Sequence, residues 1–580
     1  MPEYLSPGVY IEEIEMGAKP IEGVSTSTAG FLGETARGST KPTLVTSWLE
    51  YQRKFGSYFG ANKYLPYAVE GFFRNGGQRC YIGRIVQSTA TSASTKLLAD
   101  DNAAALTVTA VGEGSWGNRI AVKVTKDTDA FRLVVFYWKN QKDIPSSDPE
   151  ADTTTLQRAS IEIYEKVSLD DSSPNYYEKK VNAISNIVRL SKEKGDSGKV
   201  PSNWIQFLEH GIDGVEHEDT AKKLSTNPDS RIDLGTNAST ENDYYKNMEI
   251  KIVDGKGKDQ TRTITAYDGT SKIATVDENW TTNPDNTSKY RIYNPKLTVS
   301  DYTRKDINTP GEKKGLTAFE EVDQISIVYS PNSESVKDLT KVLIDHCELL
   351  KDRFAIIDER EAPSTRPYDT KYAALYYPWI NVVDPETGLL RLIPLGGHIA
   401  GIYARSDVER GVHKAPANEI VRGADSTEFA VTKGQQDILN PIGINCIRAF
   451  PGRGIRVWGA RTLSSDATWK YVNVRRLFLF LEESIEEGTQ WVVFEPNDEK
   501  LWARVKQTIS QFLTRVWKDG ALIGNTPEEA FFVKCDRTTM TQDEIDNGKL
   551  IVLIGVAPVK PAEFVIFRIA QWAGGSSTSE

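Results

Sequence analysis

The sequence predicts a multidomain protein of the mixed α/β (α+β) class, with an inserted all-β module and an extended strand arm at each end. Three observations lead to this prediction. The chain has 580 residues, several times the usual length of one domain. Helical and strand-like patterns alternate along most of it, whereas residues 225–297 carry only short β-prone stretches between turns. Both ends read as single strands that have no neighbouring strand in the sequence.

The composition is that of a globular protein, and it argues against several functional classes. Hydrophobic residues make up 39% of the chain and charged residues 26%, so disorder is not expected to dominate. The formal net charge of −10 argues against a protein that coats nucleic acid, because phosphate binding needs concentrated cations. The first residues do not resemble a signal peptide, and no run of about 18 apolar residues occurs. We therefore expect synthesis and assembly in the cytoplasm, without membrane insertion.

No pattern in the sequence predicts a catalytic, metal or cofactor site. The five histidines have neither HExxH nor HxH spacing, and no phosphate-binding loop of the GxxxxGK[ST] type occurs. The string GDSGK at 195–199 resembles the surroundings of a serine nucleophile, but it lies in a polar loop and lacks an oriented histidine base. The cysteines are far apart and form no CxxC pair: Cys80, Cys347, Cys446 and Cys535. We expect no enzyme activity and no cofactor.

The first 25 residues are predicted to be an N-terminal arm and its linker. After Pro7-Gly8, a short extended strand runs from Val9 to Ile14, and its apolar side chains are Val9, Tyr10, Ile11 and Ile14. Gly17, Gly23 and a Ser/Thr run up to Thr28 follow. Because glycine and small polar residues leave the backbone many conformations, this stretch is predicted to be a flexible linker.

Residues 26–224 are predicted to form an α/β domain. It contains a helix over 48–55, a Gly-rich turn in FFRNGGQRCYIGRI, and strands on either side of the turn at 112–120. Residues 225–297 follow as an inserted β-rich module, because their short β stretches are separated by DGKG, YDG and NPDN turns. Residues 298–365 then continue the α/β domain. The elements expected there are a helix start at 317–323, strands at 325–329 and 354–358, and a helix at 336–350.

Residues 366–562 are predicted to be a C-terminal domain that contains two amphipathic helices. The first follows a Ser or Asp cap and can end at Gly488; its apolar residues are Tyr471, Val474, Phe478, Leu481 and Ile485. Asn497 is the predicted cap of the second, which ends at Gly520 and has the apolar stripe Trp502, Val505, Ile509, Phe512 and Val516. Strand-like runs at 530–535 and 550–556 follow.

The second helix carries a cationic face opposite its apolar stripe. At 100° per residue, four cations fall within about 60° of one another: Lys500, Arg504, Arg515 and Lys518. Gln507 and Gln511 lie between them, and no acid interrupts the face. It is either an ordinary solvated surface or a dock for an acidic partner.

Residues 563–580 are predicted to be a C-terminal strand arm and tail. Residues 564–572 are apolar on both faces, and the residues that would pair and pack are Phe564, Val565, Ile566, Phe567 and Ile569. The arm could fold back onto its own domain. It could also add to the sheet of another molecule, which the absence of protective charge over 564–567 favours.

Several stretches together resemble the tail sheath proteins of contractile phages and of related contractile injection systems. They are YLSPGVYIEEI, GGQRCYIGRI, GSWGNRI, IEIYEKVSLDD, IDHCELLKDRFAIID, the run 397–424 beginning GHIAGIYARSD, and the run 444–488 beginning INCIRAFPGRG. The resemblance covers nearly the whole chain except 225–297. This insert leaves open which kind of system the chain belongs to.

The resemblance implies a structural subunit of a contractile tail sheath rather than an enzyme. Such subunits stack as hexameric rings around an inner tube and contract to drive the tube through a target envelope. The implied partners are other copies of the chain, the inner tube protein, and baseplate and tail-terminator or cap proteins, in a virion tail or an injection system. It further implies that 26–224 lies outside and 366–562 inside, and that both arms complete sheets of neighbouring subunits. The cationic face is then the candidate contact with the tube.

Two alternatives stay open. A non-contractile filament or surface-layer protein would share the arms but would not need the cationic face. A hydrolase is much less favoured, because no catalytic site is apparent.

Overall fold

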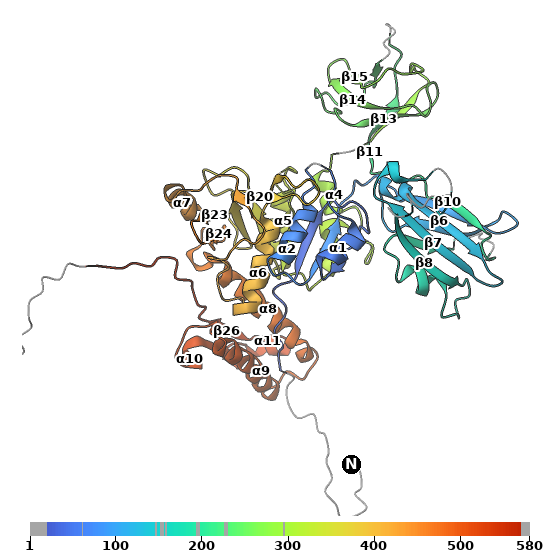
Figure 1. The fold of residues 1–580 in the computed structure, drawn as a ribbon. Helices are drawn as coiled ribbons and strands as arrows, with labels where there is room; N and C mark the ends of the chain where they lie inside the picture. Colours follow the sequence, from blue (N-terminus) through green and yellow to red (C-terminus); the bar gives the residue numbers. More distant parts are fainter. Residues whose placement is uncertain are drawn as a thin grey trace, which may run out of the picture.

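The computed structural model describes residues 20–569 except 61, 146–147, 151–155, 157–158, 193–197, 225–229, 294–295 and 334 (Figure 1). A central sheet body carries three further parts. A β-sandwich and the inserted β module lie on one side of it, and a helical C-terminal body lies on another. The N-terminal arm residues Val9, Tyr10, Ile11 and Ile14 lie outside the described residues.

The central body is built on an eight-stranded sheet in which six neighbouring strands are parallel. Its strand order is β2 (Thr43–Val45), β3 (Cys80–Arg84), β1 (Ala29–Gly33), β17 (Ile327–Tyr329), β18 (Phe354–Asp358), β19 (Ala373–Tyr377), β23 (Ile444–Phe450) and β24 (Gly454–Trp458). Only the outermost pairs, β2–β3 and β23–β24, are antiparallel. Strands β17, β18 and β1 are buried along their length, as expected for parallel strands covered on both faces.

Helices cover both faces of this sheet. α2 (Leu65–Arg74) and α6 (Gly396–Arg410) pack against each other on the face where the Phe31 ring meets Phe72, with ring centroids 5.3 Å apart. The opposite face is covered by the 3-10 helix η4 (Gly315–Glu321), because a Cβ on Gly30 would lie 2.7 Å from the Phe319 ring. α5 (Leu339–Leu350) packs against β17, β18 and η4. The remaining helices of this body are α1 (Trp48–Phe55), α4 (Val299–Thr303) and α7 (Lys433–Leu439).

A small three-stranded sheet lies beside the central body. Its order is β21 (Leu390–Ile393), β20 (Ile380–Val383) and β22 (Ser426–Thr427), and its strands are antiparallel.

A β-sandwich follows β3 in the chain. One sheet has the order β10 (Trp204–Phe207), β6 (Ile120–Lys126), β7 (Phe131–Trp138) and β8 (Ala159–Val167). The other has the order β4 (Ser94–Leu98), β5 (Ala104–Ala110) and β9 (Val188–Ser191). Leu106, Leu133 and Trp116 belong to the single apolar core between the two sheets. The alternation of inward and outward side chains along β4 and β9 is typical of a sandwich.

The inserted module is a six-stranded antiparallel sheet with its own core. Its order is β11 (Val215–Thr220), β16 (Lys289–Tyr293), β13 (Glu249–Asp254), β14 (Thr261–Asp268), β15 (Ile273–Val276) and β12 (Arg231–Asp233). Lys222, just past β11, bridges to Asp233 of β12, so the sheet curves back toward its first strand. Because β11 pairs with β16, the sheet begins at Val215, ahead of the boundary at 225 that composition suggested.

The C-terminal body consists of two long helices and a two-stranded sheet. α8 (Val472–Gly488) and α9 (Glu499–Lys518) enclose an apolar core together with α10 (Pro527–Ala530), β25 (Phe531–Lys534), α11 (Gln542–Asp546) and β26 (Leu553–Val556). α8 ends at Gly488, as predicted, and α9 ends at Lys518, two residues before the predicted end at Gly520. The predicted caps were displaced: Asp498 caps α9 by accepting from Leu501 N at 2.8 Å, and α8 follows Tyr471 without a side-chain cap. No helix in the described part of the chain is long and apolar enough to cross a membrane.

The three-dimensional domains do not follow the linear boundaries expected at 224, 298 and 365. The eight-stranded sheet takes β1–β3 from residues 29–84 and its other strands from residues 327–458. The sandwich and the inserted module are therefore successive insertions into one sheet body. The local composition of the sequence could not reveal these insertions, because parallel pairing joins strands that are hundreds of residues apart.

Candidate functional site

The cationic face predicted on α9 lies in solvent. All six of its polar side chains are exposed: Lys500, Arg504, Gln507, Gln511, Arg515 and Lys518. The opposite stripe, which includes Trp502, Ile509 and Phe512, is buried in the C-terminal core. Within the described residues, none of the four cations forms an ion pair. The face is therefore free to meet an acidic surface, although its role as a dock stays a prediction.

Two of the four cations also have contacts within the chain. The Arg504 guanidinium lies 4.6 Å from the centre of the Trp491 ring, so it is held by the loop that precedes α9. Arg515 donates a hydrogen bond to the backbone carbonyl of Ile21. Pro20 and Ile21 line a hollow with Arg515 and Lys518. The root of the N-terminal arm thus lies beside one end of the cationic face.

The segment that was expected to be a flexible linker is anchored from Ile21 onward. The Ile21 side chain is fully buried in the core of the C-terminal body, and a Cβ on Gly488 of α8 would lie 2.6 Å from it. Val24 N donates to Ser484 Oγ at 3.1 Å. Gly23 lies against Phe480, whose ring would be 2.8 Å from an added Cβ. The prediction of a flexible linker was wrong for residues 21–28, because one buried isoleucine and these hydrogen bonds outweigh the flexible composition.

A buried ion pair extends this anchor to the central body. Arg476 of α8 pairs with Asp407 of α6 at 2.6 Å, and both side chains are almost completely buried. Thr26 completes the cluster: its hydroxyl donates to Asp407 at 2.7 Å, and its carbonyl accepts from Arg476 at 2.7 Å. The arm root therefore joins the two bodies that α6 and α8 belong to.

The C-terminal arm leaves the body at Glu563, which several side chains hold. Arg461 donates to both carboxylate oxygens, at 2.7 and 2.8 Å. Asn440 donates at 2.9 Å, Tyr471 at 3.0 Å, and Lys470 lies 3.3 Å away. Burial by itself would raise the pKa of Glu563, but these hydrogen bonds and the charge of Arg461 outweigh it and lower the pKa to about 2. We call these five side chains the Glu563 clasp.

Beyond the clasp, the arm is exposed and apolar. The exposed fraction is 70% for Phe564 and rises to 95% for Ile569; Val565, Ile566 and Phe567 lie between these values or close to them. Over 564–569 the chain forms no strand and pairs with no sheet of the described chain. Folding back onto its own domain is thus not seen over these residues.

The two-stranded sheet β25–β26 presents open edges. Its strands pair only with each other within the described chain, and β25 packs on α9. On the outward side, Phe532 and Leu553 are about half exposed. An edge with free N–H and C=O groups beside apolar side chains can accept an added strand.

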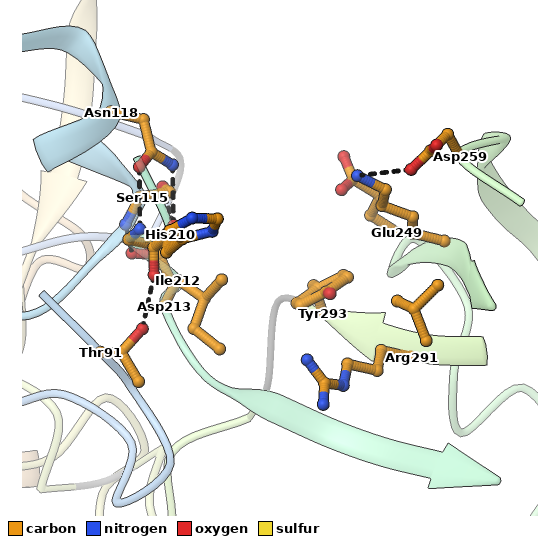
Figure 2. A pocket seen from close by; sticks show the side chains of 13 residues that line it. Thr91, Ser115, Asn118, His210, Ile212, Asp213, Glu249, Asp259, Arg291 and Tyr293 are labelled. Carbon is orange, nitrogen blue, oxygen red and sulfur yellow. Dashed lines mark hydrogen bonds and ion pairs between the residues drawn. The ribbon is translucent and has the colours of Figure 1, made fainter. Parts of the chain in front are cut away.

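A cavity of about 660 Å³ separates the sandwich from the inserted module (Figure 2). On the sandwich side, Asp213 accepts from Ser115 N at 2.9 Å and from Ser115 Oγ at 2.5 Å, and Asn118 donates to the Gly211 carbonyl at 2.7 Å. Arg291 and Tyr293 lie across the gap on β16. These hydrogen bonds join the turn at 115–118 to the loop at 211–213.

Sequence reasoning missed Ile21, the Glu563 clasp and the loop before α9. The sequence did contain one signal for the clasp, because Glu563 is a single acid directly before the apolar run that starts at Phe564. The partners of that acid, however, lie about 90 to 125 residues away along the chain.

Two family models match adjoining parts of the chain. The phage tail sheath protein central domain matches residues 296–463, and the phage tail sheath C-terminal domain matches residues 464–571. The tail sheath protein of Vibrio phage KVP40 is 27% identical over 215 residues, which is 36% of this chain and 31% of that protein. The tail sheath protein of Burkholderia phage BcepMu is 30% identical over 191 residues, 31% of this chain and 38% of that protein. The matched segments thus span about a third of each phage protein.

Solved structures share the fold over nearly the whole chain. The helical sheath of the anti-feeding prophage in its contracted state superposes with a TM-score of 0.52 at 23% identity, over 98% of this chain and all of that chain. A sheath tail protein from Listeria innocua gives a TM-score of 0.53 at 11% identity, over 93% of this chain and 97% of that chain. At these sequence identities, the comparison with the solved structures shows that the fold is shared and nothing further.

Proposed function

Because this chain belongs to the phage tail sheath protein family, we propose that it is a structural subunit of a contractile sheath. One observation carries the proposal: the central and C-terminal domains of the family follow each other without a gap over residues 296–571. The copies would stack as hexameric rings around an inner tube and shorten to drive the tube through a target envelope. No catalytic role is part of this proposal.

The arms would connect the copies by completing one another's sheets. Each backbone hydrogen bond that an added strand forms contributes about 1 kcal/mol net. Each large apolar side chain of 564–569 that becomes covered contributes about 1.5–3 kcal/mol. β25–β26 is the acceptor that the structure favours, because its edges are open and its outward side is apolar. A lattice built in this way would hold while the folded bodies move.

The two anchors would let the arms carry load. Ile21 and Glu563 are each held by the folded body within a few residues of the start of an arm. A force that acts on an arm would therefore reach α8, α9 and the central sheet directly, because in the part of the chain that the structure describes no long unanchored segment lies between the arm and the folded body. This arrangement suits a sheath whose subunits must move together.

The cationic face would meet an acidic surface of the inner tube. Charge pairing across a wet surface holds register and can be released without exposing an apolar patch. Lys500 and Arg504 are the better residues for a test, because Arg515 also holds the arm root. The double change Lys500→Glu and Arg504→Glu should abolish tube-bound sheaths at low salt and leave tube-free polymers intact. If this variant formed normal tube-bound particles, the cationic face would not be the contact with the tube.

The remaining partners are baseplate proteins and tail-terminator or cap proteins. The particle would be assembled in the cytoplasm as part of a virion tail or an injection system.

Negative-stain microscopy of the purified chain tests the proposal as a whole. Hollow helical cylinders that exist in a long and a short form are the expected result. Flat arrays, or filaments of one fixed length per subunit, would instead favour a surface-layer or non-contractile filament protein. A variant that ends at Glu563 should stay monomeric with an unchanged fold; cylinders formed by that variant would exclude the C-terminal arm as the connector.

A further inference from the structure

The loop between α8 and α9 ends in an apolar tip formed by Val493 and Phe494. The Phe494 side chain is 102% exposed, so it is not packed against any other part of the chain that the structure describes, and Val493 is 60% exposed. The backbone of Phe494 has a φ of +69°, in the left-handed region. A residue with a Cβ is disfavoured there, and glycine or asparagine would fit more easily. The isolated subunit thus gains nothing from a phenylalanine at this position.

The loop holds the tip in a defined position. Val493 N donates to the Gln490 carbonyl and Glu495 N donates to the Val492 carbonyl, at 3.3 and 3.2 Å. Asn497 ties the other side of the loop: its amide donates to the Lys549 carbonyl at 3.0 Å, and its oxygen accepts from Trp502 Nε1 at 2.8 Å. A strained, fully exposed aromatic residue on a braced loop is the arrangement of a preformed anchor for a partner.

The tip lies beside the cationic face of α9. Arg504 of that face rests on the Trp491 ring, and Trp491 precedes Phe494 by three residues, a separation of at most about 11 Å between Cα atoms. A standard interface of about 800 Å² per partner has a radius of about 16 Å. A protein surface of that size centred near Arg504 can therefore extend to the tip.

We propose that Val493 and Phe494 form an apolar anchor that enters a socket on the inner tube, beside the acidic surface that meets the cationic face. This inference rests on the proposed function. The socket needs an apolar floor, acids on the side of Arg504, and a hydrogen-bond donor or a cation on the side of the exposed Glu495. The anchor determines where along the tube each subunit sits, since charge pairing alone tolerates small shifts and an inserted ring does not.

The test uses the full-length chain with Phe494→Asn. Asparagine removes the ring but tolerates the left-handed backbone, so the thermal midpoint of the monomer should equal or exceed that of the parent. Leu389→Asn is the matched control, because Leu389 is a leucine in the loop between β20 and β21 and is 70% exposed. Each chain is assembled alone and with the inner tube protein, and tube-free polymers and sheathed tubes are counted by electron microscopy.

The expected result is at least about a tenfold loss of sheathed tubes for Phe494→Asn, with normal tube-free polymers and a control that behaves as the parent. Unchanged sheathing by Phe494→Asn would overturn the inference. Loss of tube-free polymers would overturn it as well, because the tip would then bind another copy of the chain. The parent chain is assembled and examined before any variant is made. If it forms neither tube-free polymers nor sheathed tubes, that result contradicts the proposed function rather than this inference.

Discussion

The Glu563 clasp allows a quantitative prediction about how the C-terminal arm is fixed. The change is Glu563→Gln, which removes the negative charge and keeps the size of the side chain. Arg461 is only 8% exposed, and it would lose a bidentate partner whose bonds measure 2.7 and 2.8 Å. Hydrogen bonds to charged groups contribute about 1.5–3 kcal/mol, and breaking a fully buried pair costs about 3–5 kcal/mol. Because the carboxylate keeps some contact with water, we expect a loss of about 2 kcal/mol.

A double-mutant cycle with Arg461→Met isolates this contribution from other effects of each change. The free energy of urea unfolding of parent, single and double variants should give a coupling of about 2 kcal/mol near neutral pH. A coupling below about 0.5 kcal/mol would show that the clasp is an ordinary surface contact, and the anchoring argument would then fail.

The same cycle has a defined pH dependence. The pKa of Glu563 is lowered in the folded chain, from 4.5 to about 2, so the unfolded chain binds a proton first as the pH falls. The stabilisation is therefore complete above about pH 4.5 and is lost progressively between 4.5 and about 2. If the coupling free energy fell instead between pH 6 and 8, the stabilisation would come from the titration of a group other than Glu563.

Three further outcomes follow from the anchors and the arm. Ile21→Ala should cost about 2–4 kcal/mol in urea unfolding, because the side chain is fully buried between α8 and α9; a loss below about 1 kcal/mol would mean that the segment is not anchored. Asp407→Asn should cost about 3 kcal/mol by leaving Arg476 buried without its charge partner, and restored stability in the double variant with Arg476→Met would confirm that cause. Phe567→Asp should block self-assembly while leaving the thermal midpoint of the monomer unchanged, because its ring is exposed in the subunit; a lowered midpoint would mean that the arm already packs on its own body.

The helices of the C-terminal body show what periodicity can reveal. The apolar stripe of α9 is buried, and its cationic face is exposed, as a spacing of three and four residues predicts. The cap was misplaced by one residue because Asn497 and Asp498 are both good caps. Tertiary contacts decided between them: Asn497 bonds to Trp502 and to the Lys549 carbonyl, which leaves Asp498 to cap the helix.

The N-terminal segment shows where composition misleads. A Gly/Ser/Thr-rich stretch indicates flexibility in isolation, yet this segment is fixed, because the Ile21 side chain is buried between α8 and α9 and the residues after it form hydrogen bonds with α8. No local signal distinguishes an isoleucine in a linker from an isoleucine that anchors one.

The sequence by itself determined the local features: the amphipathic helices, the β-rich insert, the apolar arm and the family resemblance, all of which depend on the spacing of residues close together in the chain. Only the tertiary structure decided which distant segments share a sheet, where the domains divide, and which residues hold the arms. Those features depend on contacts between residues such as Arg461 and Glu563, whose proximity arises only when the chain folds. Phe494 belongs to the second group, since its complete exposure and left-handed backbone exist only in the folded loop.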